Sequence, residues 1–294
     1  MKSTVRLHIL LARDAPVGLV IRHGTAKSVC TLLWDRKRDQ ITLGQWMRGR
    51  IETGSCDLSP DGEHFLYSAA KCPRGDLIEW TVVSRTPYLK AVAYYPWRRG
   101  GGWFMNNQDY CVFSGSPDPK ALEHPEVRRV ESVLSQPSLC ALRMVRGGWS
   151  IGKSRFNDEI EFERDLGRGW TLRHQEGAGY GEHPQYSLSR EGLKADTRGW
   201  DWADVDGSRL VWTAKGCLYS GLLRTAGLDQ VKLLHDFNGM KFEALAAPYE
   251  GGRPVVERKE PPEPAKRTTA RAGKKWIKPH KKRNRAKVRP GDES

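Results

Sequence analysis

The sequence has no long hydrophobic run, since no stretch of its 294 residues approaches the about 18 apolar residues that a membrane-spanning helix requires. The apolar stretch near the N-terminus is interrupted by Arg6 and His8, which makes it too short and too polar for a signal peptide. We therefore expect a cytoplasmic protein that makes no contact with a membrane.

Cysteine is present, but not in any metal-binding arrangement. There is no C-x-x-C pair and no zinc-like spacing between the cysteines and the eight histidines. The six cysteines are scattered, mostly in apolar segments: Cys30, Cys56, Cys72, Cys111, Cys140 and Cys217. We interpret them as small buried hydrophobic residues in a reducing compartment, and we predict neither a metal site nor a cofactor.

Motifs of common enzyme classes are missing as well. There is no Gly-x-Ser-x-Gly elbow and no H-E-x-x-H spacing. Two Glu-His-Pro strings, at residues 123–125 and 182–184, place an imidazole beside a carboxylate, but residues before proline favour extended loops, so we interpret both as exposed loops. A site assembled from distant segments would leave no motif, and the sequence therefore leaves open whether the protein is an enzyme.

Positive charge is abundant but unevenly distributed. The formal net charge of the chain is +14. Residues 253–294 contain 15 Lys and Arg against 5 Asp and Glu, a net charge of +10, which leaves 34 basic and 30 acidic residues upstream. The upstream part therefore has a net charge of only +4, and such a balanced surface requires no anionic partner.

Short apolar segments rich in β-formers, separated by turn residues, dominate the upstream part. Aromatic content supports a packed body, because ten of the 11 tryptophans precede residue 253. We predict strands at Val5 to Ala12, Val17 to Arg22, Val29 to Trp34, Ile41 to Met47, Ile78 to Ser84 and Leu89 to Tyr95.

A turn motif recurs along the chain. The segment Asp57-Leu58-Ser59-Pro60-Asp61-Gly62 precedes the apolar strand around residues 65–67, and Asp206-Gly207 precedes a similar strand at 210–212, an offset of 145 residues or about three periods of 48. The first segment resembles the D-x-S-P-D-G segment of TolB-like and WD40-like β-propellers. The resemblance covers one good and one degenerate copy, and regular Gly-His and Trp-Asp pairs are absent. It implies an all-β, irregular β-propeller-like domain of about five blades, with a β-sandwich or two smaller β-domains as the alternative.

Residues 147–154 match the phosphate-loop pattern G-x-x-x-x-G-K-S. A phosphate loop opens a helix, whereas residues 159–163 alternate with the period of a strand. The local Arg-Gly-Trp pattern also recurs at residues 168–172, where no phosphate loop is possible. We therefore interpret the match as a glycine turn that leads into a strand.

Two further segments carry specific expectations. Pro125, followed by Val127, Val130 and Leu134, predicts a short inserted helix. The aromatic and basic segment at residues 94–104 contains the residues that we expect on a ligand-binding loop face: Trp97, Arg98, Arg99 and Trp103. The alternative for this segment is an inter-blade loop whose aromatic side chains fold back onto the core.

The C-terminal region completes the expected organisation: a propeller-like domain at residues 1–250, a linker at 251–264 and a disordered basic tail at 265–294. The residues that we expect to contact nucleic acid or another polyanion are Lys274, Lys275, Trp276, Lys278, Lys281, Lys282, Arg283, Arg285, Lys287 and Arg289. We predict a non-enzymatic binding or scaffold protein with a protein partner. The alternative is a propeller-type hydrolase or lyase whose active site the sequence does not reveal.

Overall fold

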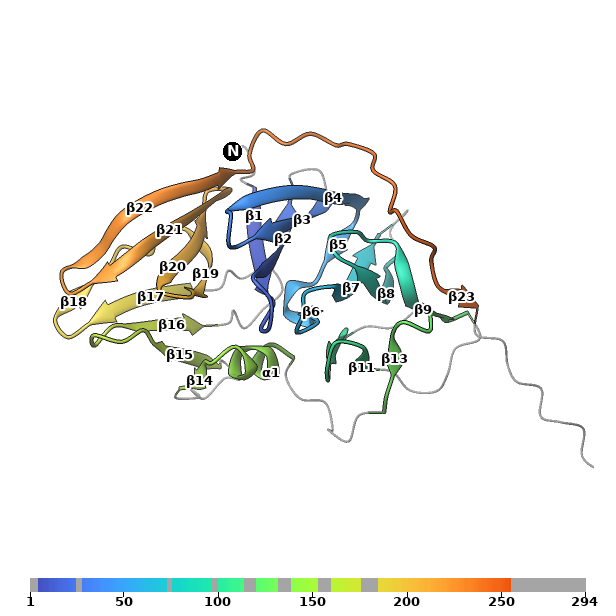
Figure 1. The fold of residues 1–294 in the computed structure, drawn as a ribbon, viewed down its shortest axis with the longest axis horizontal. Coiled ribbons are helices and arrows are strands. Elements are labelled where there is room, and N and C mark those ends of the chain that lie inside the picture. Colours follow the sequence, from blue (N-terminus) through green and yellow to red (C-terminus); the bar gives the residue numbers. More distant parts are fainter. Residues whose placement is uncertain are drawn as a thin grey trace, which may run out of the picture. The chain divides into compact units, whose positions relative to one another are not determined.

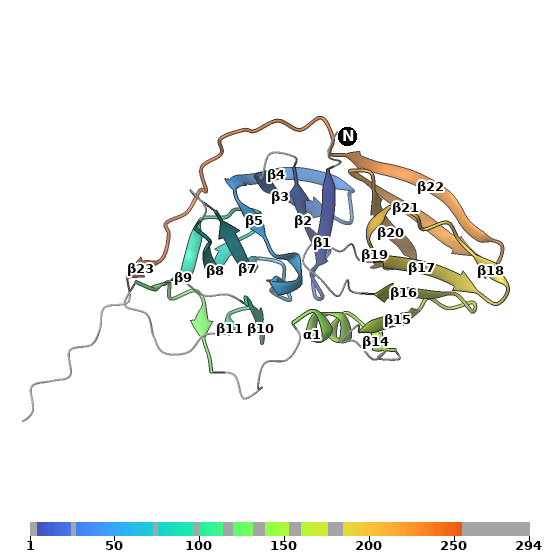
Figure 2. The same cartoon turned by 180° about the vertical axis from the view of Figure 1, so that it is seen from behind.

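The computed structural model describes residues 5–24, 28–72, 76–96, 100–113, 120–131, 139–152, 160–175 and 185–254. The chain divides into two units, residues 1–256 and 257–294, and every described residue belongs to the first. The described residues form five β-sheets, here called A to E in chain order, together with one α-helix and one short 3-10 helix (Figures 1 and 2). The unit is an all-β, irregular β-propeller-like domain, as the sequence predicts.

Sheet A confirms the first four predicted strands. Its antiparallel order follows the chain: β1 (Arg6–Leu11), β2 (Val17–His23), β3 (Ser28–Asp35) and β4 (Gln40–Arg48). Because side chains alternate along a strand, Leu19 and Ile21 of β2 face the core shared with sheet B, whereas Val20 faces the core shared with sheet E. Sheet A is therefore buried on both faces, as a blade between two neighbours must be.

Sheet B is the largest sheet. Its strands are β5 (Arg50–Ile51), β6 (Asp57–Leu58), β7 (His64–Lys71), β8 (Ile78–Arg85), β9 (Ala91–Pro96), β12 (Leu122–Glu123) and β23 (Arg253–Pro254), and the 3-10 helix η1 (Thr53–Ser55) lies between β5 and β6. The predicted strands at 78–84 and 89–95 are confirmed as β8 and β9. Phe65 of β7 faces sheet A, and its neighbour Leu66 faces a core shared with sheet C.

The D-x-S-P-D-G segment forms the tight turn between β6 and β7. The Gly62 N–H donates to the Ser59 carbonyl at 2.9 Å, and the His64 N–H donates to the Ser59 hydroxyl at 2.9 Å. Asp61 accepts the Glu63 N–H at 3.0 Å. Gly62 has φ +78°, a conformation that L side chains rarely adopt. The hydrogen bonds of this turn join residues within a few positions of one another, which explains why the sequence alone predicts it.

Sheet C corrects one prediction. Its strands are β10 (Gly102–Phe104), β11 (Asp109–Val112) and β13 (Arg128–Arg129), with β13 parallel to β11. The predicted helix from Pro125 is wrong for the described residues 120–131, where Val127 is buried and Arg128 donates its N–H to the Gln108 carbonyl at 2.9 Å. Pairing with a distant strand thus overrides the local helical pattern. The helix lies later, at α1 (Leu139–Arg146).

Sheets D and E share one aromatic core. Sheet D contains β14 (Ser150–Ile151), β15 (Glu161–Asp165), β16 (Thr171–Gln175), β17 (Gln185–Arg190) and β18 (Leu193–Lys194); sheet E contains β19 (Trp200–Asp206), β20 (Arg209–Ala214), β21 (Cys217–Arg224) and β22 (Gly227–Asp236). Trp170 and Leu172 from sheet D and Trp200 and Trp212 from sheet E pack together in this core. The predicted Asp206-Gly207 turn joins β19 to β20, with Gly207 at φ +62°.

The phosphate-loop string contributes to sheet D instead of opening a helix. Gly147 and Gly148 follow α1 in a turn, and Ser150 and Ile151 pair with β15. The described part of this string is therefore a turn that leads into a strand, as we interpreted it. Its last two residues, Lys153 and Ser154, lie outside the described residues.

All six cysteines are free. Four are buried, as expected from their apolar surroundings, whereas Cys72 is exposed and Cys217 is partly exposed. No helix among the described residues is long and apolar enough to span a membrane.

The segment after β22 crosses sheet A and reaches sheet B. Residues 237–252 form this crossing, and β23 then pairs with β12, within the range expected for the linker (Figure 1). The Gln45 side chain donates to the Leu245 carbonyl at 2.8 Å, and the Tyr249 hydroxyl donates to the Lys90 carbonyl at 2.6 Å. The C-terminal end of the folded unit thus ties sheet E to sheets A and B.

Replacing Gly101 with Ala is expected to lower the free energy of unfolding by about 3 kcal/mol, because it combines left-handed strain with overpacking. Gly101 has φ +66°, and a Cβ there would lie 1.9 Å from the Ser55 carbonyl oxygen. Gly199→Ala is the matched control, since Gly199 has φ +79° but open space around it, and we expect it to cost only about 1 kcal/mol. Urea denaturation of both variants measures the difference. Equal losses of unfolding free energy in the two variants would show that the close approach of Gly101 to the Ser55 carbonyl makes no additional contribution to stability.

Candidate anion-binding cavity

A cavity lies where β1 of sheet A, β6 of sheet B and β19 of sheet E meet helix α1. It has a volume of about 330 Å³ and is lined by β1, β6 and β19, by α1, and by single residues of β15, β16 and β17. Its charged and imidazole-bearing lining residues are Arg13, Arg36, Arg143, Arg146, Arg164, Asp57, Asp204, His8 and His174. Five arginines against two aspartates make the cavity cationic.

Helix α1 supplies two of these arginines. Arg143 donates from Nη1 to the carbonyls of Thr53 at 2.8 Å and Cys56 at 2.9 Å, and Arg146 donates to the Phe104 carbonyl at 2.8 Å. Neutral carbonyls fix the direction of a guanidinium group without neutralising its charge. Burial lowers the pKa of Arg146 below its ordinary value, which reflects how little solvent stabilises this charge.

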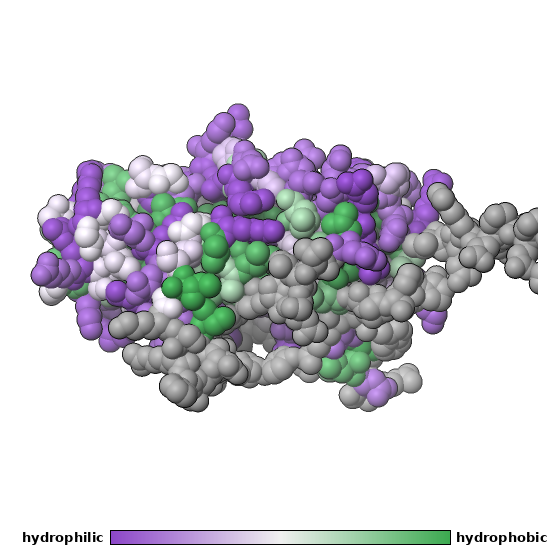
Figure 3. Space-filling view, turned by 90° about the horizontal axis from the view of Figure 1, so that it is seen from below, coloured by the Kyte–Doolittle hydropathy of each residue, from purple (hydrophilic) through white to green (hydrophobic). Residues whose placement is uncertain are grey.

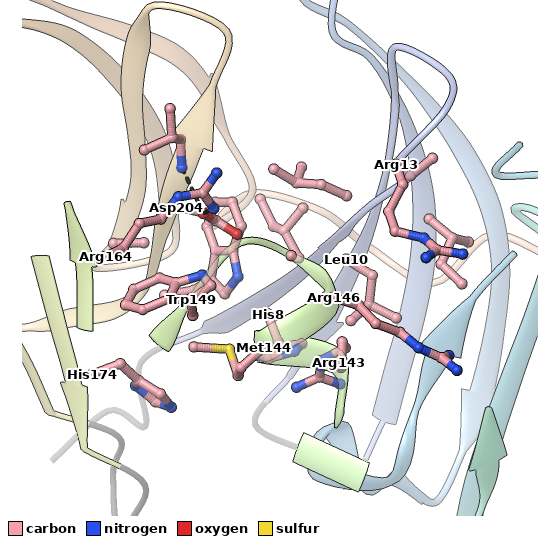
Figure 4. Close-up of a pocket in the computed structure, with 18 of the residues that line it drawn as sticks. His8, Leu10, Arg13, Arg143, Met144, Arg146, Trp149, Arg164, His174 and Asp204 are labelled. Atoms are coloured by element: carbon pink, nitrogen blue, oxygen red, sulfur yellow. Dashed lines mark hydrogen bonds and ion pairs between the residues drawn. The ribbon is translucent and has the colours of Figure 1, made fainter. Parts of the chain in front are cut away.

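The opposite side of the cavity holds an ion pair. Arg164 of β15 donates from Nη1 to Asp204 of β19, and the Val205 N–H donates to the same carboxylate at 2.7 Å. Burial raises the pKa of Asp204, and Arg164 opposes this shift. Figure 4 shows Arg164, Asp204 and the Trp149 indole together on one side, away from Arg143 and Arg146.

Two imidazoles line the same cavity in their neutral form. Burial, followed by the nearby Arg143 charge, lowers the pKa of His174 to about 4 and that of His8 well below its ordinary value. His174 is 6% exposed and stacks on Tyr186 with ring centroids 4.6 Å apart. Within the described part of the chain, His8 Nε2 and His174 Nδ1 have no hydrogen-bond partner.

The ion pairs leave an excess of positive charge. Arg164 is paired with Asp204, and Arg36 is paired with Asp206 at 3.0 Å. Two remaining guanidinium groups, those of Arg143 and Arg146, act on the single carboxylate of Asp57, a surplus of one positive charge, and Arg13 is exposed and also lies near Asp14. Burial raises the pKa of Asp57, while the Phe104 N–H at 2.8 Å and the two helix arginines oppose the shift. The arrangement suits a small ligand that carries at least one negative charge.

Of the predicted site residues, only Trp103 lies among the described residues, and it does not line the cavity. Trp97, Arg98, Arg99 and the ten tail residues from Lys274 to Arg289 are outside the described residues and remain predictions. Trp103 is only 2% exposed and packs against Phe113 with ring centroids 5.3 Å apart, the arrangement of the alternative in which these aromatics fold back onto the core. A side chain so buried offers little surface to a ligand.

The first Glu-His-Pro string is not wholly the exposed loop that we expected, because Glu123 ends strand β12 and His124 is partly buried at the start of the turn that follows. His124 accepts the Glu126 N–H at 3.3 Å through Nδ1. The second string, at residues 182–184, lies outside the described residues.

None of the residues that line the cavity was predicted as a site residue from the sequence. Arg143 and Arg146 are three positions apart, the spacing of one helix face, but the helix was not predicted there. Arg13, Arg164 and Asp204 come from three different sheets, and no local motif links them.

Comparisons with known proteins do not assign a family. No family model and no curated protein matches the chain. One similar solved structure is AtxE2 isopeptidase in its apo form, with TM-score 0.31, 9% identity and coverage of 81% of this chain; this chain spans only about half, 53%, of the isopeptidase. A second is dihydro-heme d1 dehydrogenase NirN in complex with DHE, with TM-score 0.28 and 12% identity; the match covers 79% of this chain and 67% of NirN. A third is TolB from Acinetobacter baumannii, with TM-score 0.19 and 10% identity; the match covers 79% of this chain and 64% of TolB.

Proposed function

We propose that the protein is a non-enzymatic binding protein whose cavity captures a small anionic molecule bearing a phosphate or carboxylate group. One observation carries this proposal: the guanidinium groups of Arg143 and Arg146 stand against the single carboxylate of Asp57, so the cavity has an excess of positive charge. The volume of about 330 Å³ is at the lower end of the range for small-molecule sites.

The guanidinium groups are already oriented before any ligand binds. Arg143 is fixed by two carbonyls of the η1 region and Arg146 by the Phe104 carbonyl. A preorganised donor loses little conformational entropy on binding, and charge-assisted hydrogen bonds to oxyanions are stronger than neutral ones. A bound anion also stabilises the charge of Arg146, which burial shields from water.

Arg146→Gln and Arg13→Gln are each expected to weaken binding of inorganic phosphate by about tenfold, because a lost charge-assisted hydrogen bond is worth about 1.5–3 kcal/mol. Isothermal titration calorimetry of the full chain with inorganic phosphate measures the change. Arg48→Gln is the control, since it removes the same charge from an exposed position at the end of β4, outside the cavity.

The control separates a specific site from general attraction by a cationic protein. Arg48→Gln is expected to change the dissociation constant by less than about twofold. Equal weakening by all three variants, or no binding to the unaltered chain, would contradict the cavity proposal. Urea denaturation of Arg146→Gln tests whether loss of its contact with Phe104 has also destabilised the fold.

A propeller-type hydrolase or lyase is the second candidate. It is favoured by the presence of His8 and His174, neutral at physiological pH, in the same cavity as Asp57 and Asp204. A catalytic imidazole is normally oriented by a carboxylate on its second nitrogen. The described residues supply no such partner to His174, and we therefore favour binding over catalysis.

The basic tail forms the second part of the proposed function. The nine Lys and Arg residues between Lys274 and Arg289 attach the protein to nucleic acid or another polyanion through counterion release. Trp276 adds stacking on an exposed base. On this proposal the folded unit, acting in the cytoplasm as a binding module or scaffold, recognises its small ligand independently of the tail.

A further inference from the structure

Helix α1 joins two sheets that share no core among the described residues. Sheets A and B, A and E, B and C, and D and E each share a hydrophobic core. Sheets C and D share none within the part of the chain that the structure describes, and α1 lies between them in both views (Figures 1 and 2). The ring of sheets is therefore connected at this point by a helix.

The first two residues of α1 pack against different sheets. Leu139, 8% exposed, packs against Trp103 and Cys111 of sheet C, whereas Cys140 belongs to the core of sheets D and E. These two are the buried residues of the helix, and Val145 is 48% exposed. The molecule is largely hydrophilic on the side where α1 lies, with smaller hydrophobic patches (Figures 1 and 3). An element held by so few apolar contacts opens at a lower free energy than the core strands do.

Trp103, which the sequence predicts on a ligand-binding face, has a different role in this arrangement. Trp103 and Leu139 belong to one cluster, and neither of them lines the cavity. Leu139 lies four residues before Arg143, on the same side of the helix. The contact between Trp103 and Leu139 therefore fixes the position from which Arg143 reaches the cavity.

The polar contacts of α1 involve the cavity directly. Arg143 donates to carbonyls beside η1, and Arg146 donates to the Phe104 carbonyl of β10. Both guanidinium groups line the cavity, whose other walls include β1, β6 and β19. An anion bound by these arginines therefore links α1 to the walls formed by sheets A, B and E.

We propose that α1 opens and closes the ring between sheets C and D, and that an anion bound in the cavity stabilises the closed state. This inference rests on the proposed function, since it assigns a conformational role to the same cavity. The open state lacks Arg143 and Arg146 as ligand contacts, so the anion binds the closed state more tightly and shifts the equilibrium towards it. By reciprocity, a change that loosens α1 weakens anion binding. Leu139 and Trp103 are then positioning residues, which act on the ligand through the two arginines.

Inorganic phosphate at about 100 times its dissociation constant is expected to slow hydrogen exchange of the amides of residues 143–149 by up to about 100-fold, because the ligand stabilises only the closed state. The N–H groups of Gly147, Gly148 and Trp149 donate to carbonyls of α1 at 2.9, 3.0 and 3.0 Å, so their exchange reports opening of the helix. Mass spectrometry of the full chain measures the rates. The amides of the outer hairpin formed by β21 and β22 are the control, since local opening there leaves the cavity walls in place, and they are expected to change by less than about twofold.

A substitution outside the cavity tests the positioning role. Leu139→Ala is expected to raise the apparent dissociation constant for inorganic phosphate by about threefold to tenfold, because it lowers the fraction of closed molecules. It should also speed exchange at residues 143–149 when phosphate is absent. Leu139→Met keeps most of the side-chain volume and should bind within about twofold of the unaltered chain.

Leu218→Ala is the matched control for Leu139→Ala. It removes the same atoms from a leucine that is 0% exposed, in the core of sheets A and E and outside the cavity lining. We expect it to change the dissociation constant by less than about twofold, because α1 is unaffected. Isothermal titration calorimetry measures all three variants, and the exchange experiment on the unaltered chain is independent of how the variants fold.

The outcomes separate this inference from the proposed function. Phosphate binding without slower exchange at residues 143–149 would overturn the inference and leave the proposed function intact. Equal loss of affinity in Leu139→Ala and Leu218→Ala would indicate a general loss of stability and would overturn it as well. Failure of the unaltered chain to bind phosphate would overturn both.

Discussion

Removal of residues 265–294 is expected to abolish binding of the protein to single-stranded nucleic acid at physiological salt. Residues 274–289 contain nine Lys and Arg and no acidic residue, whereas the sequence upstream of residue 253 has a net charge of only +4. With about 6–10 phosphate contacts, affinity of the full chain should fall by about 10³–10⁵ between about 50 and 200 mM salt. Anisotropy of a labelled strand of about 16 nucleotides measures both effects.

Trp276→Ala separates stacking from charge in the same assay. It leaves the net charge unchanged, so it should lower affinity without altering the salt dependence, by up to the about 1–3 kcal/mol of one stacked base. Unchanged binding by the chain that ends at residue 264 would show that the tail is not the attachment site.

Replacement of Arg164 with Met is expected to lower the free energy of unfolding by about 3 kcal/mol, at the lower end of the range for breaking a buried ion pair. The Arg164 and Asp204 side chains are 21% and 19% exposed, so some solvent reaches the carboxylate that remains. The loss arises from the uncompensated Asp204 charge, and urea denaturation at about pH 7 measures it.

The pH dependence of the unfolding free energy and a double variant show whether the loss in Arg164→Met comes from the unpaired Asp204 charge. Burial already raises the pKa of Asp204, and without Arg164 the pKa must rise further. At pH values between the pKa of Asp204 in the unfolded chain and its higher pKa in the folded chain, the folded state binds more protons, so the free energy of unfolding falls as pH rises. The loss of stability caused by Arg164→Met should therefore be smaller at about pH 5 than at about pH 7. Arg164→Met/Asp204→Leu should recover most of the stability. A deficit that is independent of pH and persists in the double variant would indicate lost packing instead.

Much of the fold was predictable because its signals are local. The strands of sheet A, the Ser59 turn before β7 and the Asp206-Gly207 hairpin each depend on residues within a few positions of one another. The helix prediction was wrong because Arg128 and Arg129 pair with β11 and Val127 is buried, and local periodicity does not reveal this pairing. The error therefore occurred where long-range pairing overrides short-range preference.

The site was not predictable in this way. Arg13, Arg146 and Asp204 come from three parts of the chain that share no spacing, and Leu139 reaches Trp103 only because α1 packs against sheet C. A propeller-like ring collects one or two residues from each of several distant strands, and a single sequence does not record which of them converge.

The sequence by itself determined that the chain is strand-rich, where its tight turns lie, and that its positive charge is concentrated in the C-terminal region, because each of these properties is set by neighbouring residues or by composition. Only the tertiary structure decided that the part of the chain upstream of residue 253, whose positive and negative charges nearly cancel, contains a cationic cavity. Net charge is a sum over the chain, whereas the field in a recess depends on which side chains are close together and which are already paired.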